Sequence, residues 1–224
     1  MSGTALKWIA VVSMFLDHAA EVLLADFAVS SLLWRQIYEV MRGVGRLAFP
    51  IYAFLLVEGF LHTRDIKKYQ MRLLVFAALS EIPFDLAVFH TLFYWNYQNV
   101  FFTLFLGLLA LSGIRAGEQD AAGKGLWKQA LAVLLCGGAA QLLKSDYGGF
   151  GVFFIVLLYV TRYDKKTQTM LGSISLVWEL PAVLAFLPIR MYNGTRGTCR
   201  NKYFFYTFYP LHLLILWIIR QICF

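Results

Sequence analysis

Two ionisable residues on the first apolar stretch, Lys7 and His18, are the leading candidates for chemistry in this chain. Their spacing is close to three whole turns of an α-helix, so both side chains are expected on one face, roughly 16 Å apart along the axis. Ionisable groups inside a membrane helix are costly and usually functional. An imidazole titrates near neutral pH and suits proton transfer. We therefore expect His18 to act as a general base and Lys7 to be a cation at the membrane rim.

Carboxylates flank this histidine. Asp17 is adjacent to His18, but consecutive helical residues point about 100° apart, so the two need not form a dyad. Glu21, about one turn after His18, is better placed to orient the ring. The alternative is that His18 bonds a neighbouring helix and only stabilises the packing.

Two further pairs of charged residues have one-turn spacing. Glu81 and Asp85 enclose Pro83, which removes a backbone hydrogen bond and opens the helix locally. They are expected either to form a substrate or proton site or to make ion pairs with Arg42 or Arg46. These arginines, separated by a glycine-containing segment, can hold a carboxylate or phosphate, or can serve as an interfacial anchor.

Two other sites have weaker patterns. Glu58 and His62 are one turn apart, which fits a substrate role or a salt bridge from Glu58 to Lys7 or Lys67. A second histidine, His212, lies in the last apolar stretch. It is either structural or part of a site.

The composition indicates the class of protein that carries these residues. Hydrophobic residues make up 60% of the 224 and charged residues only 15%, whereas soluble domains contain roughly 25% charged residues. We expect an all-α, polytopic membrane bundle of about eight spanning helices that forms a single domain over residues 1–224. The net charge of +7 favours anionic lipid or substrate over nucleic acid. The three cysteines lack metal-like spacing, so neither a metal site nor a disulfide framework is expected.

Eight apolar stretches are the candidate spans, and the second and sixth are short for a membrane helix. They cover residues 5–24, 47–62, 69–89, 99–114, 127–143, 150–162, 170–188 and 203–219. The segments near 26–46 and 189–202 are expected to be loops. No internal repeat is evident.

The distribution of Lys and Arg predicts the orientation. Loops two, four and six carry more of these residues than the other loops, so both termini are expected in the cytoplasm. This topology places Lys7 at the cytoplasmic end. It places His18, the Glu81–Asp85 pair, Asn99 and Asn193 towards the outer side.

Ordered motifs along nearly the whole chain resemble the TraX family, membrane proteins named for acetylation of conjugative pilin. They include LKWIA at 6–10, LDH at 16–18, GRLAFPI at 45–51, FLLVEGF at 54–60, SEIPF at 80–84, QNV at 98–100, YNG at 192–194 and YPLHL at 209–213. The spacing of Lys7 and His18 is also similar to a first-helix signature of the wider transmembrane acyltransferase superfamily.

The resemblance implies an acetyl-CoA-dependent acetyltransferase, without a metal, in the bacterial cytoplasmic membrane. Its acceptor would be an amine or hydroxyl of a pilin-like protein or cell-envelope component. On this hypothesis the catalytic residues are His18, Asp17 and Glu81; the donor-binding residues are Lys7, Arg46, Asn99 and Glu58; the acceptor-binding residues are Asp85, Arg42, Asn193 and His212. The alternatives are a proton-coupled transporter or channel, or a noncatalytic scaffold.

Overall fold

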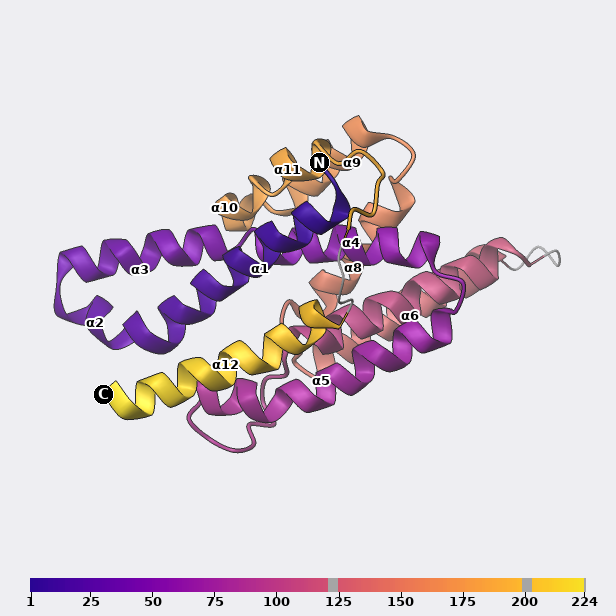
Figure 1. Cartoon of the computed structure of the whole chain (residues 1–224). Coiled ribbons are helices and arrows are strands. Elements are labelled where there is room, and N and C mark those ends of the chain that lie inside the picture. The colour runs from indigo at the N-terminus through magenta and orange to yellow at the C-terminus, as the bar shows by residue number, and fades with distance from the viewer. Residues whose placement is uncertain (121–124, 199–202, 224) are drawn as a thin grey trace. The chain divides into compact units, whose positions relative to one another are not determined.

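A computed structural model describes all residues except 121–124, 199–202 and 224, and its described part is helical without a β-strand, which confirms the predicted all-α class (Figure 1). In chain order the elements are α1 (Gly3–Ala19), a π-helical turn (Ala20–Leu24), α2 (Ala25–Ser30), α3 (Leu32–Gly45), α4 (Ala48–His62), α5 (Ile66–Val88), α6 (Val100–Glu118), α7 (Gly125–Leu142), α8 (Gly148–Val160), α9 (Lys165–Ser175), a 3-10 turn (Val177–Glu179), α10 (Leu180–Val183), α11 (Phe186–Arg190) and α12 (Phe204–Cys223).

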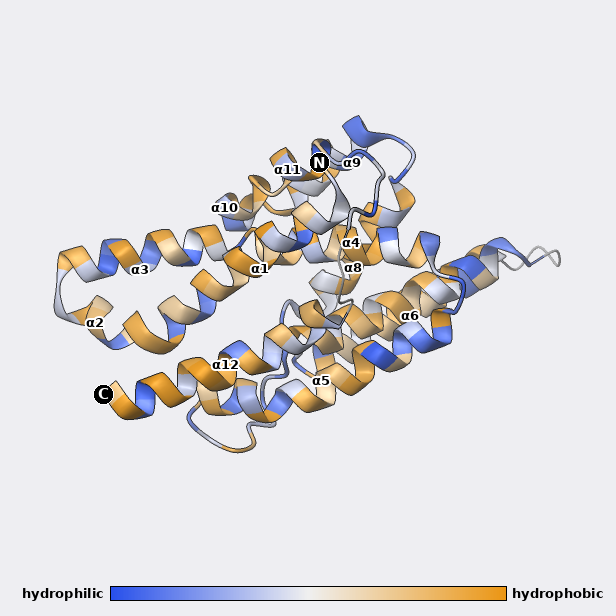
Figure 2. Ribbon diagram, viewed as in Figure 1, coloured by the Kyte–Doolittle hydropathy of each residue, from blue (hydrophilic) through white to orange (hydrophobic). Residues whose placement is uncertain are grey.

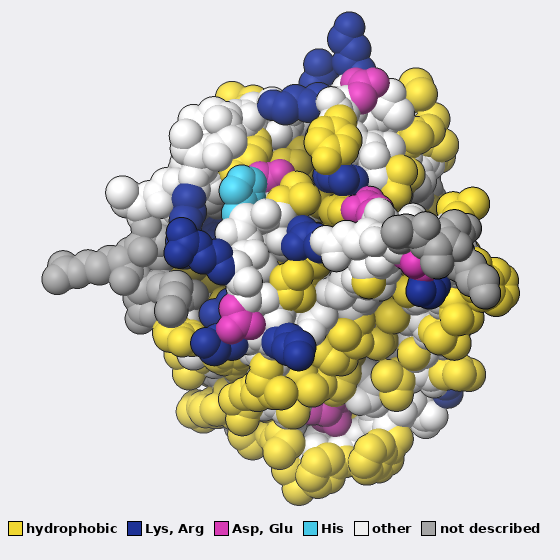
Figure 3. Space-filling model, turned by 90° about the vertical axis from the view of Figure 1, so that its right-hand side faces the viewer, with side chains coloured by type: hydrophobic (Ala, Val, Ile, Leu, Met, Phe, Trp, Pro, Cys, Tyr) yellow, Lys and Arg dark blue, Asp and Glu magenta, His cyan; other side chains and the backbone are white. Residues whose placement is uncertain are grey.

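Long apolar helices identify a membrane protein. Within the described residues, four helical stretches have the length and composition to cross a bilayer: Gly3–Ser30, Leu32–His62, Val100–Glu118 and Phe204–Cys223. Hydrophobic residues predominate along α12 (Figure 2). A space-filling view shows Lys and Arg side chains on a face that also carries many hydrophobic ones (Figure 3). The multi-pass class is supported, whereas the expected count of eight spans is not confirmed.

The chain folds as two compact units that are interleaved in the sequence. The first unit comprises Met1–Leu55, Ser80–Phe93 and Ser173–Phe224, and the second comprises Leu56–Leu79 and Tyr94–Gly172. The prediction of a single domain over residues 1–224 stays a prediction.

A helical hairpin dominates the N-terminal part of the first unit. The stretch from α1 to α2 ends at Ser31, whose extended backbone (φ −153°, ψ 153°) reverses the chain and whose hydroxyl accepts a hydrogen bond from the Trp34 amide at 3.3 Å. Helix α3 then returns beside α1 (Figure 1). The expectation of a loop near 26–46 is therefore wrong. Its mixture of apolar and charged residues lowers the mean hydropathy, but their helical spacing forms an amphipathic helix.

The last helix of the chain packs against the first. Helix α12 contacts α1 and the π-helical turn. The guanidinium group of Arg220 donates to the Val22 carbonyl at 2.7 Å and pairs with Asp26 at 2.6 Å. These contacts join segments that are nearly the whole sequence apart.

The predicted seventh span, residues 170–188, is not one helix. Helix α9 ends at Ser175, and the 3-10 turn, α10 and α11 follow. Pro181 lies in the first turn of α10 and Pro188 in α11. Proline lacks the amide that would donate to the carbonyl four residues earlier, and the breaks at 176–179 and 184–185 include those carbonyl positions for Pro181 and Pro188. By contrast, α5 remains helical through Pro83.

Helices α6, α7 and α8 form the body of the second unit. Leu106, Ala110, Ala140 and Val152 make a buried apolar cluster. Buried Asn99 caps α6: its side-chain oxygen accepts from the Phe101 amide at 3.0 Å, and its side-chain nitrogen donates to the Ala77 carbonyl at 2.9 Å.

Candidate functional site

Two histidine side chains meet between α1 and α12 in the first unit. Nδ1 of His18 lies 2.7 Å from Nε2 of His212. The rings are nearly parallel, with an interplanar angle of 22° and centroids 5.0 Å apart. This contact brings together the leading sequence candidate and a residue that the sequence left open as structural or functional.

Aromatic residues of α12 fix the orientation of both rings. Phe208 stacks on His212 with centroids 4.7 Å apart and an angle of 13°. Tyr209 presents its edge to His18 at 5.7 Å and to His212 at 5.8 Å. Residues three and four apart share a helix face, so the spacing of Phe208, Tyr209 and His212 places all three together.

The site lies where α1 changes its helical form. The π-helical turn Ala20–Leu24 begins two residues after His18, and such turns are common at functional sites. His212 is buried, with 4% of its surface exposed, whereas His18 is partly exposed. His212 is therefore the buried ring of the pair, and His18 is the more accessible one.

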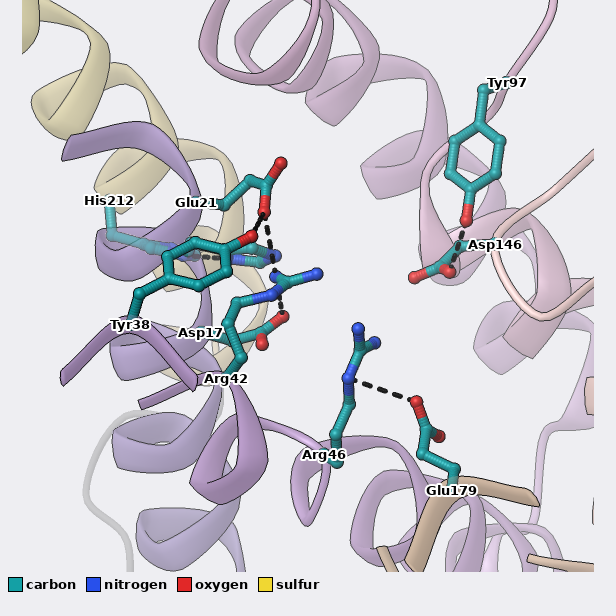
Figure 4. Close-up of polar contacts among 10 residues, drawn as sticks. Asp17, Glu21, Tyr38, Arg42, Arg46, Tyr97, Asp146, Glu179 and His212 are labelled. Carbon is teal, nitrogen blue, oxygen red and sulfur yellow. Dashed lines mark hydrogen bonds and ion pairs between the residues drawn. The ribbon is translucent and has the colours of Figure 1, made fainter. Parts of the chain in front are cut away.

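A charged cluster joins α1, the π-helical turn and α3 beside the histidines (Figure 4). Arg42 pairs with Asp17 at 2.9 Å and with Glu21 at 3.5 Å. The Tyr38 hydroxyl donates to Glu21 at 2.8 Å. Gly45 allows this close approach, because a Cβ at that position would overlap the Asp17 side chain.

A second ion pair follows one turn later on the chain. Arg46 pairs with Glu179 of the 3-10 turn at 3.1 Å (Figure 4). Two arginine–carboxylate ion pairs, Arg42–Asp17 and Arg46–Glu179, thus lie in the same unit as the two histidines.

This cluster corrects two expectations. Glu21 contacts Tyr38 and Arg42, and the side chain in contact with Nδ1 of His18 is His212 rather than the predicted Glu21. The two arginines also have different carboxylate partners, which limits their availability as a joint phosphate clamp. Asp17 pairs with Arg42, in agreement with the expectation that it need not form a dyad with His18.

Lys7 lies on the same side of α1 as His18, as their spacing predicts. Its ammonium group is 5.3 Å from the centre of the Phe205 ring on α12, within cation–π range. His18 contacts His212 further along the same helix. Both ionisable residues of α1 therefore face α12.

Three other predicted site residues lie elsewhere in the first unit. Asp85 is 1% exposed in α5, and Glu81 lies one turn earlier with partial exposure. The side-chain oxygen of Asn193 accepts from the amide and hydroxyl of Thr195 at 3.1 and 2.7 Å, which closes a turn. Substrate roles for these residues stay predictions.

Two predicted donor-binding residues belong to the second unit. Asn99 is the buried cap of α6 described above. Glu58 lies one turn before His62, whose Nδ1 is 2.8 Å from the Glu58 carbonyl oxygen and 4.0 Å from its carboxylate. Donor-binding roles for Asn99 and Glu58 stay predictions.

The sequence reasoning missed Tyr38 and the partner role of Glu179, whereas the close approach at Gly45 agrees with the expectation for the glycines between Arg42 and Arg46. Tyr38 and Arg42 are four residues apart, and Gly45 follows on the same amphipathic segment. This helical periodicity over residues 32–45 was the signal that could have identified Tyr38.

Comparisons with known proteins agree with the sequence motifs. Residues 2–220 match the family model described as TraX protein. A curated relative from Dichelobacter nodosus, described as probable fimbrial assembly protein FimC, serogroup H1, is 34% identical over 96% of this chain and 94% of its own length. No solved structure shows a significant match.

Proposed function

This chain belongs to the TraX family, and we propose that it is a membrane-embedded acetyltransferase that uses acetyl-CoA. The observation that supports this proposal best is the His18–His212 contact at 2.7 Å, beside an arginine–carboxylate cluster. An oriented imidazole in an apolar helix can accept a proton, and nearby cations can stabilise developing negative charge.

His18 has a defined task in this reaction. It accepts a proton from the amine or hydroxyl of the acceptor as that nitrogen or oxygen attacks the thioester carbonyl. The carbon–sulfur bond breaks, and the departing CoA thiolate receives the proton. A double displacement uses the same residue, because the ring nitrogen can first take the acetyl group and release CoA, then pass the acetyl group to the acceptor.

The surrounding charges suit the remaining parts of the reaction. Arg42, which pairs with the residue before His18, and Arg46, one turn further along the chain, are the candidate stabilisers of the carbonyl oxyanion. Their ion pairs with Asp17 and Glu179 hold the side chains in place. Lys7, nearer the N-terminal end of α1, is the candidate partner for phosphates of a donor that enters from the cytoplasm.

The acceptor class follows from the relatives. The curated relative is named for fimbrial assembly, and the resemblance set out above connects the family with pilin. We therefore place the acceptor among pilin-like proteins or other cell-envelope components with an exposed amine or hydroxyl. The proposed location is the bacterial cytoplasmic membrane with both termini inside.

The decisive experiment is an assay of the purified protein in lipid nanodiscs with acetyl-labelled acetyl-CoA and a purified pilin-like protein. We expect release of CoA and appearance of label on the acceptor, and loss of both with His18→Gln. His62→Gln is the matched control, since His62 lies on α4 in the second unit.

A contrary result would favour the transporter class. Flux of a solute into proteoliposomes that depends on a proton gradient, without cleavage of the thioester, would contradict the proposal. The embedded charges would then serve a permeation route.

A further inference from the structure

We propose that His212 is a positioning residue that fixes the tautomer of His18 and leaves Nε2 of His18 as the reacting atom. The catalytic part of this inference rests on the proposed function, whereas the assignment of the tautomer does not. The hydrogen-bond chain runs from the Phe208 carbonyl through His212 to His18.

The chain starts at a group that can only accept. Nδ1 of His212 lies 2.7 Å from the carbonyl oxygen of Phe208. A carbonyl oxygen has no proton to donate, so Nδ1 of His212 carries the hydrogen. A neutral imidazole has one N–H group, and Nε2 of His212 is therefore an acceptor.

The second link follows from the first. Nε2 of His212 lies 2.7 Å from Nδ1 of His18, so Nδ1 of His18 must be the donor. The lone pair of a neutral His18 is then on Nε2. In the described part of the chain no hydrogen-bond partner occurs for this nitrogen, and the ring is partly exposed.

The opposite direction of the hydrogen bond is unfavourable. If Nδ1 of His18 accepted, His212 would need hydrogen atoms on both nitrogens and would be a cation. His212 is 4% exposed and packs between the Phe208 ring and Tyr209. A buried charge without a paired anion is costly, so the neutral arrangement is preferred.

This arrangement has a mechanistic consequence. When Nε2 of His18 takes a proton or an acetyl group, the ring becomes positive and its Nδ1–H donates more strongly to His212. Orientation of a base by a third group is the general requirement for an activated imidazole. Here the orienting group is the neutral ring of His212, which is itself held by the Phe208 carbonyl.

The tautomer can be measured without activity, by nitrogen NMR of protein labelled with ¹⁵N-histidine. The chain has four histidines, and substitution of each one assigns its signals. In the wild type we expect the signature of a protonated nitrogen at Nδ1 of both His18 and His212, and that of an unprotonated nitrogen at Nε2.

Variants separate orientation from packing. His212→Phe removes the acceptor and keeps an aromatic ring against Phe208, so the proton of His18 should move to Nε2, the tautomer that free histidine prefers. His62→Phe is the matched control, because its Nδ1 also faces a backbone carbonyl at 2.8 Å. It should leave the His18 signals unchanged.

Kinetics give a second readout. His212→Phe should lower kcat by about 10²–10⁴-fold with the KM for acetyl-CoA largely kept, as for a base in the wrong tautomer. His212→Gln places an amide oxygen near the former Nε2 and should restore at least part of this loss. His212→Asn is too short to reach and should not.

The outcomes distinguish this inference from the proposed function. Protonated Nε2 on His18 in the wild type, or equal activity of the Phe and Gln variants, would overturn the role of His212 while the acetyltransferase proposal stands. The expected signals in a protein that does not cleave acetyl-CoA would overturn the proposed function and the catalytic part of this inference.

Discussion

Removal of the Arg42 guanidinium tests whether the charged cluster beside the histidines stabilises the first unit. Arg42→Met keeps much of the side-chain volume but leaves Asp17 and Glu21 without this counter-ion. The ion-pair distances are 2.9 and 3.5 Å, and the three side chains are 23%, 16% and 33% exposed, respectively. Two carboxylates would thus lose their common partner in a partly buried setting.

The magnitude follows from that burial. Breaking a fully buried pair typically costs about 3–5 kcal/mol, because one charge stays behind unpaired. Exposed pairs contribute only about 0–1 kcal/mol. The intermediate exposure here places Arg42→Met at about 2–3 kcal/mol. For a chain of this size that loss lowers the melting temperature by about 4–12 °C.

The assay is thermal unfolding of the purified protein in detergent, with a matched control on the same helix. Arg35 and Glu39 form an exposed pair at 2.9 Å with side chains 67% and 59% exposed, so Arg35→Met should change stability by less than about 1 kcal/mol. The double variant Arg42→Met with Asp17→Asn should be more stable than Arg42→Met alone, since it removes the carboxylate charge that Arg42 had balanced.

Two results would refute this reasoning. Equal melting temperatures for Arg35→Met and Arg42→Met would mean that burial does not strengthen the cluster. A double variant less stable than Arg42→Met alone would mean that the loss of the Arg42 charge beside the Asp17 carboxylate is not the source of the destabilisation.

The remaining predictions concern donor binding, chemistry, packing and topology. Lys7→Ala should raise the KM for acetyl-CoA with kcat largely kept, because a cation at the membrane rim interacts similarly with the donor in the ground state and in the transition state. An unchanged affinity for acetyl-CoA would mean that Lys7 does not bind the donor phosphates. His18→Gln should lower acetyl transfer by about 10²–10⁴-fold with CoA binding kept, and substantial transfer by this variant would make His18 a structural residue. Gly45→Ala should destabilise the protein by about 1–3 kcal/mol through overpacking, whereas Gly138→Ala, where a Cβ meets open space, should not; the comparison is made by thermal unfolding. A C-terminal tag should be protected from an impermeant reagent in intact cells, and labelling from outside would reverse the topology.

Composition and periodicity predicted the helical class, while helix boundaries depended on features that hydropathy does not register. Charged residues such as Arg35, Glu39 and Arg42 lowered the apolar signal of α3, so this segment resembled a loop. The 170–188 segment is apolar enough for a span, yet it divides into the end of α9, the 3-10 turn, α10 and α11, with Pro181 and Pro188 in the two short helices. Pro83 lies within a continuous α5, so a proline in the sequence does not by itself locate a break.

In the candidate site, too, features set by neighbouring residues were predictable from the sequence, whereas contacts between distant segments were not. The shared face of Lys7 and His18 follows from helix geometry alone. The partner of His18 does not, since His212 is 194 positions away and only the packing of α12 on α1 brings it close. Glu21 was the better local candidate by spacing, but the α3 side chains Tyr38 and Arg42 bind it instead.

The contact between the first and last helices also constrains how this protein is made. A ribosome adds about 5–20 residues per second, so the 194 positions between His18 and His212 correspond to about 10–40 s of translation. During that interval α1 has been synthesised while α12 has not. A nascent membrane segment with His18 must therefore be tolerated without its partner until translation is nearly complete, whereas Asp17 can pair with Arg42 as soon as α3 has been made. Truncation before α12 would leave His18 without His212 while the Asp17–Arg42 pair could still form.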